Sequence, residues 1–358
     1  MPERRLTRRH LIMTAAAASL AAGRVVSAQV GEPRRGGVPR VALPRIPDRI
    51  DLVAGDAWEP AWVQSLVYDT PLRITAAGDV VAGAGIAYNP DPNGRFIDIP
   101  VRSGMAFSHS EHVTARDLAA SIERSIEATP SGDAWRWSSV ERVEVTGDDE
   151  VRIHVSVPDS TLPATLASPL VPVMPAGTSH QPLAFEELPV GTGPFVPSRT
   201  DDGTLVFRSN RLYWEIGRPR FDGCTVTAVE QEIERTSRLV TGLVDIVPSV
   251  PPLDIPLLQD DPGILLSGDV SRRQCAVVVR LDQEPLNVAE VRRLVASVID
   301  REALVEGATV GTAIASAGLF PPDHWAGSPD LGIAPPESAE EVREQLAMLG
   351  LLPGWPVR

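Results

Sequence analysis

The short segment SHSEH, residues 108–112, brings two imidazoles and a carboxylate close together in the chain. His109, Glu111 and His112 have side chains of the kinds that bind zinc and activate a metal-bound water, which is the chemistry of a metal-dependent enzyme. A zinc site usually needs three or four protein ligands, however, and the remaining histidines are scattered along the sequence. A solvated turn is the favoured interpretation. No metal ligand is assigned, and a metal-dependent enzyme is kept as the minor alternative.

Cys224 and Cys275 are the two cysteines of the chain. In an oxidising compartment they could form a disulfide, and two buried thiols are the other interpretation. Each lies in an alternating apolar pattern, GCTVTAV and QCAVVVRL, which favours two core residues in strands. Their spacing fits no metal site.

Motifs of several enzyme classes are missing from the sequence. It contains no G-x-S-x-G nucleophile elbow, no H-E-x-x-H zinc helix and no phosphate-binding G-x-x-x-x-G-K-[ST] loop. We therefore predict no catalytic residue and no cofactor.

A strand, a turn and a helix are expected to follow one another between residues 101 and 121. Phe107 ends an apolar-alternating strand, and Thr114 precedes an amphipathic helix that is expected to end near Ala128. Thr114 is suited to the N-cap, and Asp117 occupies the third helical position, where a carboxylate can accept from free backbone amides. The local sequence thus predicts both the start of this helix and the turn before it.

The same stretch, VRSGMAFSHSEHVTARDLAAS, resembles the F-S-D-G-x-P-V-T-A-x-D-V-x-x-S segment of the extracytoplasmic solute-binding proteins of family 5, which serve peptide- and nickel-type ABC importers. Four further segments resemble family motifs and fall in the family's order: VGTGPF at 190–195, NRLYW at 210–214, RTSRLVTGLVDI at 235–246 and EPLNVAEVRRLVASVIDREALVEGA at 284–308. Each motif is weak alone. Their common order identifies the chain as a member of the family.

This resemblance implies an α/β protein with the two-lobed, type II-like fold of periplasmic binding proteins. The first lobe is expected to be complete at residues 29–270, with an inserted subdomain at about 66–188. The second lobe is expected to be partial, at 271–358, because complete family members are longer and the chain looks truncated at its C-terminus. A truncated or degenerate member that folds without binding a solute is therefore an alternative.

The resemblance also implies a non-enzymatic receptor. It would capture a solute between the lobes by hinge closure and then dock on an ABC permease in the inner membrane. Di- and oligopeptides are the first candidates for the solute, followed by nickel chelates and other small polar compounds.

Trp135 and Trp137, in the segment SGDAWRWSS, are the best candidates for ligand contact, because the matching segment of relatives faces the cleft. Packing beneath the subdomain is the alternative, since tryptophan is usually mostly buried. Asp48 and Arg49, in the loop after the first expected strand, are weaker candidates.

The N-terminus resembles a Tat-type export signal. Arg8 and Arg9 precede an Ala-rich apolar stretch from 11 to 23, and Val26-Ser27-Ala28 looks like a cleavage site. The apolar stretch is short for a membrane anchor, which needs about 20 residues. A signal peptide at 1–28 and a periplasmic location are therefore expected, and no lipid anchor, because the first cysteine is Cys224.

The formal charge of −14 further limits the partners. An acidic protein repels nucleic acid and anionic lipid headgroups, so neither is expected to bind.

Periodicity supplies the remaining elements. Strands are expected at 38–43, 71–75, 96–101, 141–147, 150–157, 204–209, 224–229, 244–247 and 274–280. Helices are expected at 59–67, 114–128, 161–167, 230–242, 252–260, 288–300 and 338–349.

Overall fold

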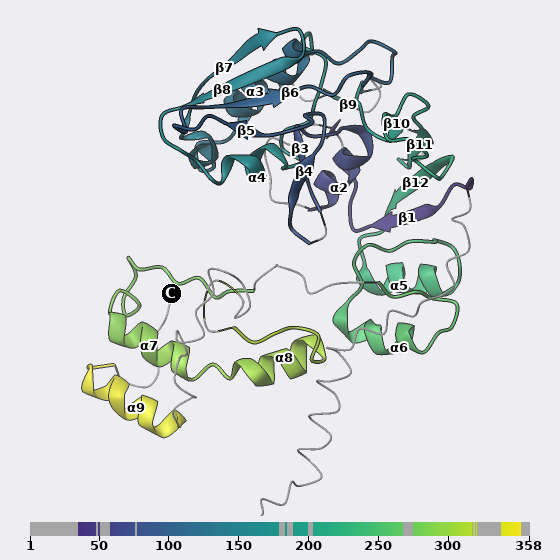
Figure 1. Cartoon of the computed structure of the whole chain (residues 1–358). Helices are drawn as coiled ribbons and strands as arrows, with labels where there is room; N and C mark the ends of the chain where they lie inside the picture. Colours follow the sequence, from purple (N-terminus) through teal and green to yellow (C-terminus); the bar gives the residue numbers. More distant parts are fainter. Residues whose placement is uncertain are drawn as a thin grey trace, which may run out of the picture.

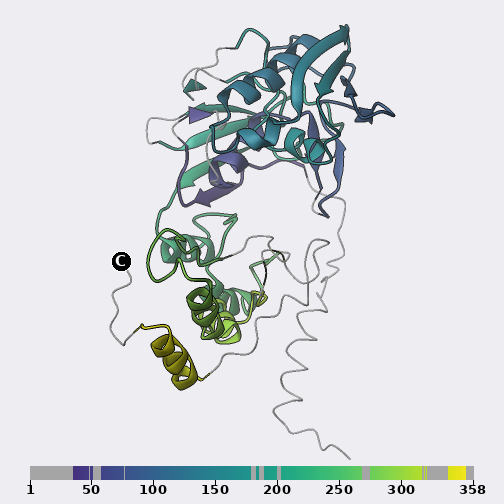
Figure 2. The ribbon, with the colours of Figure 1, turned by 90° about the vertical axis from the view of Figure 1, so that its left-hand side faces the viewer.

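The computed structural model describes residues 35–47, 49–50, 58–75, 77–178, 183–184, 189–199, 203–267, 275–316, 318, 320 and 338–351. Its labelled strands gather in one body. The chain leaves this body near residue 230, and helices α5 to α9 lie below it in Figures 1 and 2. The predicted signal peptide at 1–28 lies outside the described residues. None of the helices described is long and apolar enough to cross a membrane.

The first sheet has the strand order β1-β12-β11-β10. Its strands are β1 (Arg40–Leu43), β10 (Phe195–Arg199), β11 (Leu205–Ser209) and β12 (Gly223–Ala228). β1 runs parallel to β12, and the other neighbours are antiparallel. Alternate side chains of β10, β11 and β12 are buried, and with Val41 and Leu43 of β1 they pack against helix α2 (Trp58–Val67) in one apolar cluster. The strand predictions at 38–43, 204–209 and 224–229 are confirmed within a residue or two, whereas β10 was not predicted.

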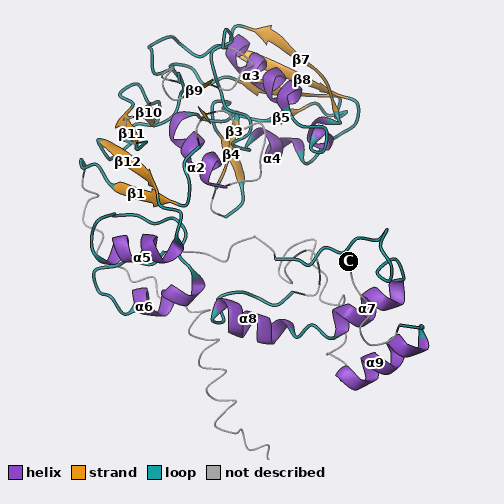
Figure 3. Ribbon diagram, turned by 180° about the vertical axis from the view of Figure 1, so that it is seen from behind, coloured by secondary structure: helices purple, strands orange, loops and turns teal. Residues whose placement is uncertain are grey.

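The second sheet has the order β5-β6-β8-β7 and is antiparallel. Its strands are β5 (Asn89–Pro90), β6 (Phe96–Pro100), β7 (Val140–Gly147) and β8 (Glu150–Val155). Helix α3 (Ala115–Ala128) lies across β7 and β8 (Figure 3). The predicted hairpin on either side of residues 147–149 is confirmed.

Helix α3 begins as the sequence predicts. Thr114 accepts a hydrogen bond from the backbone amide of Asp117, whose carboxylate accepts from the backbone amide of Thr114 in return. This capping box satisfies two amides that have no partner within the helix. Leu118 and Ile122 then lie on the buried face, at 0% exposure, in a large apolar cluster drawn from residues 72–173. We call this unit the α3 subdomain.

Two short strand pairs and two short helices complete the body. β2 (Arg49–Ile50) pairs with β9 (Leu183–Ala184), and β3 (Leu72–Ile74) pairs with β4 (Val80–Ala82), all antiparallel. The helices are α4 (Leu162–Leu166) and the 3-10 helix η1 (Ala134–Trp137). Helix α4 and strand β3 were predicted from the sequence, whereas β2, β4, β5 and β9 were not.

The described residues after β12 form helices and no strand. It contains α5 (Glu232–Val240), the 3-10 helix η3 (Pro252–Asp254), α6 (Ile255–Gln259), α7 (Ala289–Ser297), α8 (Arg301–Thr309) and α9 (Ala339–Met348). All but α8 fall within predicted helices. The helix ends after α7, and a separate helix, α8, begins at Arg301. Asp300 caps α8 by accepting from the amide of Ala303.

Two strand predictions in this part are wrong. At 244–247 a single parallel bridge joins Ile246 to Val41, and no strand forms. Residues 275–280 pair with no strand among the described residues, and Val277 and Val278 are 80% and 90% exposed. An alternating apolar pattern predicts a strand only when another strand is available to pair with it. The described residues from 275 to 351 are called the C-terminal segment below.

The cysteine prediction is half wrong for the same reason. Both cysteines are free thiols, and Cys224 is buried on β12 as expected. Cys275 is exposed, because no strand among the described residues covers its segment. The division into lobes near residue 270 stays a prediction.

Candidate functional site

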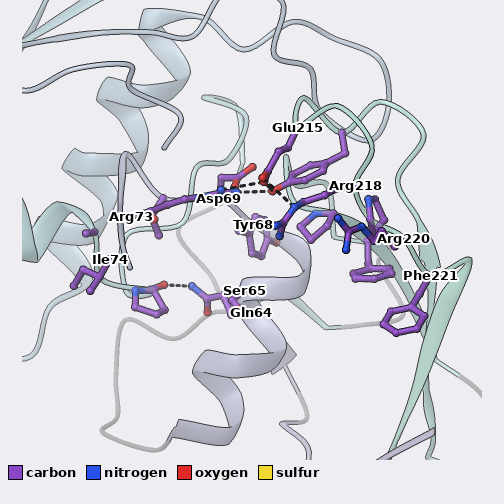
Figure 4. A pocket seen from close by; sticks show the side chains of 17 residues that line it. Gln64, Ser65, Tyr68, Asp69, Arg73, Ile74, Glu215, Arg218, Arg220 and Phe221 are labelled. Atoms are coloured by element: carbon purple, nitrogen blue, oxygen red, sulfur yellow. Dashed lines mark hydrogen bonds and ion pairs between the residues drawn. The ribbon is translucent and has the colours of Figure 1, made fainter. Parts of the chain in front are cut away.

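A cavity of about 550 Å³ lies in the body, at the end of helix α2 (Figure 4). Its walls come from residues 64–74, from Pro194 and Phe195 at the start of β10, and from residues 213–221, with Ala167 and Pro169 closing one side. The volume falls in the range of pockets that bind small molecules.

Two glycines allow the β10 turn to reach the end of α2. A Cβ atom on Gly191 would lie 2.1 Å from the carbonyl oxygen of Val67, and one on Gly193 would lie 2.5 Å from the carbonyl carbon of Val67. The amide of Gly193 donates to that same oxygen at 2.8 Å. The glycines of the VGTGPF segment therefore let one wall of the cavity form.

One side of the cavity is an ionic network around Asp69. Its Oδ1 accepts from Nη2 of Arg73 at 2.6 Å, and its Oδ2 accepts from the indole Nε1 of Trp214 at 2.9 Å. Arg73 also donates to the Tyr213 hydroxyl and, at 3.3 Å, to Oε2 of Glu215. Burial raises the pKa of Asp69, and the adjacent Arg73 opposes that rise. Burial and the nearby Asp69 both raise the pKa of Tyr213.

Stacking of two arginine side chains on Trp214 also holds this network in place. The guanidinium carbon of Arg102 lies 3.9 Å from the Trp214 ring centre, and that of Arg73 lies 4.8 Å from it. Arg102 is itself held by the carbonyl of Gly83, to which its Nε donates at 3.0 Å. At the rim, Nε of Arg218 pairs with Oε1 of Glu215 at 3.1 Å. Every carboxylate of this wall therefore already has a cationic partner.

Two buried polar atoms of the cavity lining have no partner among the described residues. They are Oε1 of Gln64 and the hydroxyl of Tyr68. Both residues are almost fully buried, at 2% and 4% exposure. Neither atom has accessible surface, so neither is open to a molecule in the cavity.

The sequence matches a known family over most of its length. Residues 81–355 match the bacterial extracellular solute-binding proteins, family 5 (middle). The chain belongs to this family. Members of family 5 are solute-binding proteins.

Curated relatives of this family 5 chain are distant in sequence and longer. Di/tripeptide-binding protein 1 of Pseudomonas aeruginosa is 22% identical over 300 residues, which cover 77% of this chain and 56% of the relative. The probable di/tripeptide-binding protein 5 of the same species is 26% identical over 215 residues, covering 58% of this chain and 40% of the relative. The chain thus spans roughly half the length of these relatives.

Solved structures show the fold. The oligopeptide-binding protein AppA from Bacillus subtilis, in complex with a nonapeptide, superposes with a TM-score of 0.75 at 18% identity, covering 89% of this chain and 65% of that one. AgaA from Agrobacterium tumefaciens R10, in complex with agropinic acid, gives 0.71 at 21% identity, covering 88% and 64%. The family 5 chain therefore has the α/β fold of periplasmic binding proteins.

The two predicted tryptophans lie apart from the cavity. Trp137 is 7% exposed in the core of the α3 subdomain, and its Nε1 donates to Oγ1 of Thr129 at 3.0 Å. Trp135 is 60% exposed, with the guanidinium of Arg136 against its ring at 5.2 Å. Neither is among the described residues that line the cavity. Ligand contact by Trp135 or Trp137 stays a prediction.

The weaker candidates are less fully described. Asp48 lies outside the described residues, and Arg49 is described only as a backbone position of β2, paired with Ala184. In the SHSEH turn, Nε2 of His109 lies 3.4 Å from Oε2 of Glu111, and all three candidate ligands are exposed. The described part of the chain holds no group of three or more histidine, cysteine or acidic side chains that could bind a metal.

The cavity residues were not found from the sequence. Gln64, Tyr68, Asp69 and Arg73 belong to no motif that periodicity picks out, and residues 213–221 lie far from them in the chain. The nearest signals were two motifs, NRLYW, which supplies Tyr213, and VGTGPF, which supplies Pro194 and Phe195. Both motifs indicated the family but gave no information on which residues they contact.

Proposed function

We propose that this chain is the solute-binding receptor of an ABC importer and that it captures a di- or oligopeptide or a similar small polar solute. The observation that carries the proposal is the family match over residues 81–355. The names of the relatives that bind di- and tripeptides, and the peptide in the AppA structure, support a peptide-like solute. The cavity at the end of α2 offers part of the binding surface, with polar and apolar side chains in its walls.

The receptor acts without catalysis and delivers its solute to a permease in the inner membrane. Binding in this class works by closure of two lobes about a hinge, which leaves the covalent bonds of the solute unchanged. A solute recovered by mass spectrometry after prolonged incubation should have its original mass. Recovery of cleaved or modified solute would contradict the non-enzymatic role.

The protein acts in the periplasm after export by its Tat-type signal. The paired Arg8 and Arg9, the apolar stretch and the Val26-Ser27-Ala28 site support this proposal. Replacing both arginines by lysine should abolish export while leaving expression unchanged, because the Tat pathway reads the arginine pair. Unchanged periplasmic yield would contradict the Tat assignment.

Solute binding itself is tested by titrating the exported protein with a library of di- and tripeptides while following tryptophan fluorescence. Saturable quenching is expected, and Trp135→Phe should remove part of the signal if the exposed indole contacts the solute. Trp62→Phe on α2 is the matched control, because Trp62 is only partly buried and does not line the cavity. No saturable response to any peptide, from protein that is folded by circular dichroism, would indicate the degenerate alternative.

A further inference from the structure

Ile216 is fully exposed at the corner of a tight turn. The amide of Arg218 donates to the carbonyl oxygen of Glu215 at 3.0 Å, and Gly217 between them has a φ of +81°. A positive φ at the third residue is typical of a type II turn and suits glycine. The turn therefore holds Ile216 at its second position, where the side chain is 100% exposed.

Further apolar side chains lie around this turn. Leu212 and Phe221, on either side of it in the chain, are 43% and 45% exposed. Val38 lies close to Phe221, because the carbonyl oxygen of Gly37 accepts from the amide of Asp222 at 2.9 Å, and Val38 is 52% exposed. Single exposed apolar residues are ordinary on protein surfaces, whereas a group of them marks a site of contact with a protein or a membrane.

Four arginines accompany these apolar side chains. The guanidinium of Arg35 lies against the turn, since its Nη2 is 3.3 Å from the position that a Cβ on Gly217 would take. The amide of Gly36 donates to the carbonyl oxygen of Arg220 at 2.8 Å, which holds the two segments side by side. Figure 4 shows Arg220 near Phe221 at the edge of the cavity. The arginines are Arg35, Arg211, Arg218 and Arg220, and all four are exposed.

Two carboxylates offset part of this positive charge. Glu215 pairs with Arg218 at 3.1 Å, and Asp222 accepts from a backbone amide. The described residues provide no ion pair for the other three arginines. The surface is therefore locally basic, although the formal charge of the chain is −14.

We propose that this surface docks on the periplasmic leaflet of the inner membrane by binding anionic phospholipid. The Ile216 surface, as we call it, consists of the four arginines and of Val38, Leu212, Ile216 and Phe221. Ile216 enters the interfacial region of the bilayer, and the guanidinium groups around it pair with lipid phosphates. The inference depends on the proposed export of the chain and is independent of solute capture.

The size of the surface favours a membrane over an acidic protein as the partner. A stable protein interface buries about 1,600 Å² in total and needs a broad surface of matching shape. The apolar part of the Ile216 surface comes from one turn and its immediate neighbours. An interfacial contact needs only a small inserted apolar area together with attraction between basic side chains and anionic lipid.

The net charge of the chain does not prevent this contact. The sequence predicts repulsion from anionic lipid headgroups because the protein as a whole is acidic. At physiological ionic strength, however, charges are largely screened beyond about 8 Å. Lipid headgroups therefore respond to the arginines beside Ile216 and only weakly to acidic side chains elsewhere. The expectation drawn from net charge does not extend to this surface.

Co-sedimentation of the exported protein with lipid vesicles tests the inference. Vesicles of phosphatidylethanolamine and phosphatidylglycerol should bind the protein at least about tenfold more tightly than vesicles of phosphatidylcholine, because each unpaired arginine contributes roughly a fivefold gain on an anionic surface. Added salt should weaken the binding. Absence of binding to the anionic vesicles would overturn the inference and favour an acidic protein as the partner.

Substitutions link the binding to the named residues. Ile216→Asp should weaken it at least about tenfold, since an inserted apolar side chain is lost and a repelling charge is added, whereas Ile216→Leu should retain it. Arg220→Gln should weaken it about fivefold. Ile233→Asp is the matched control for the first change, because Ile233 is 74% exposed but lies between two glutamates of α5. Arg343→Gln, at an exposed position of α9, is the control for the second.

The outcomes also separate this inference from solute capture. If Ile216→Asp and Ile233→Asp weaken vesicle binding equally, or neither does, the contact lies elsewhere and the assignment to the Ile216 surface is overturned. Circular dichroism of each variant checks that the fold is intact, so that a loss of binding is not a loss of structure. Peptide titration is performed without lipid, so its failure would contradict the receptor function and leave the vesicle result standing.

Discussion

The α3 subdomain and the C-terminal segment contain helices that begin in the same way but pack very differently. Helices α3 and α9 both start with a capping box, built on Thr114 and Ser338 respectively. Helix α3 buries a full apolar face against a sheet, whereas Val342 is the one buried hydrophobic residue described on α9. A cap stabilises the start of a helix whether or not the helix is covered, so equal capping signals accompany unequal tertiary stabilisation.

The strands of the two regions differ in the same sense. Ile97 and Ile99 of β6 pair with Ile153 and Val151 of β8, and all four side chains are buried. Residues 275–280 are also apolar, but they have no partner strand among the described residues. Burial of an alternating segment is therefore decided by the neighbours that the fold supplies, and less by the segment's own sequence.

The two cysteines give the largest expected contrast. Burial raises the pKa of the Cys224 thiol to about 12, whereas Cys275 is exposed. Because the thiolate is the reactive form, Cys275 should react with a thiol reagent such as DTNB at least about a hundredfold faster than Cys224 at pH 7.5. The Cys275→Ser variant isolates Cys224, and full reaction in urea checks that both thiols are present. Equal rates in the native protein would show that β12 is not covered as described.

Core truncations extend the contrast to stability. Leu118→Ala on α3 removes a side chain with 0% exposure and should lower the free energy of unfolding by about 2–5 kcal/mol, because a cavity is left behind. Leu304→Ala on α8, where the side chain is 58% exposed, should change it by less than about 0.5 kcal/mol. Urea denaturation followed by circular dichroism measures both. A large loss for Leu304→Ala would mean that the C-terminal segment is covered in solution.

These contrasts also explain what the sequence could predict. Helix α3, its Thr114 cap and the β7–β8 hairpin are local features, since each depends on residues only a few positions apart, and all three were predicted. The strand expected at 274–280 and the burial of Cys275 depend on a distant partner, and both predictions were wrong. The motif order indicated the family because it averages over five separate segments.

The candidate site was harder to predict for the same reason. Asp69 and Trp214 are 145 positions apart in the chain and meet in one hydrogen bond of 2.9 Å. The unpartnered atoms of Gln64 and Tyr68 can be recognised only when their surroundings are known. The two tryptophans were nominated together because they are two positions apart, yet one is buried in the α3 subdomain and the other is exposed.

The paired caps allow a closer test of the first comparison. Thr114→Ala should lower the global free energy of unfolding by about 1 kcal/mol, because the amide of Asp117 loses its acceptor in a helix that unfolds with the core. Ser338→Ala removes an equivalent bond to the amide of Glu341. Its effect should be confined to faster hydrogen exchange in α9, with little change in global stability. Equal global losses would show that α9 unfolds together with the α3 subdomain.

The smallest effect is expected where β1 meets the chain that leads to the C-terminal helices. Nε and Nη2 of Arg40 donate to the two oxygens of Asp245 at 2.9 Å, and the Arg40 amide donates to Oδ2 at 2.8 Å. The side-chain hydrogen bond with Arg40 is the largest cause that lowers the pKa of Asp245. Because the folded-state pKa lies below the unfolded value, the pair's contribution is complete above the unfolded pKa and is lost as the pH falls through the folded one.

Asp245→Asn should therefore flatten the acid limb of the stability profile slightly, with a smaller change than Thr114→Ala, since both side chains of the pair are nearly half exposed. Urea denaturation between pH 7 and pH 3 measures this, and added salt should reduce the difference between variant and parent. Asp260→Asn is the control, because Asp260 is exposed and forms no ion pair within the described part of the chain. An identical acid limb in parent and Asp245→Asn would show that this ion pair contributes nothing to joining the strand-rich body to the helical segment.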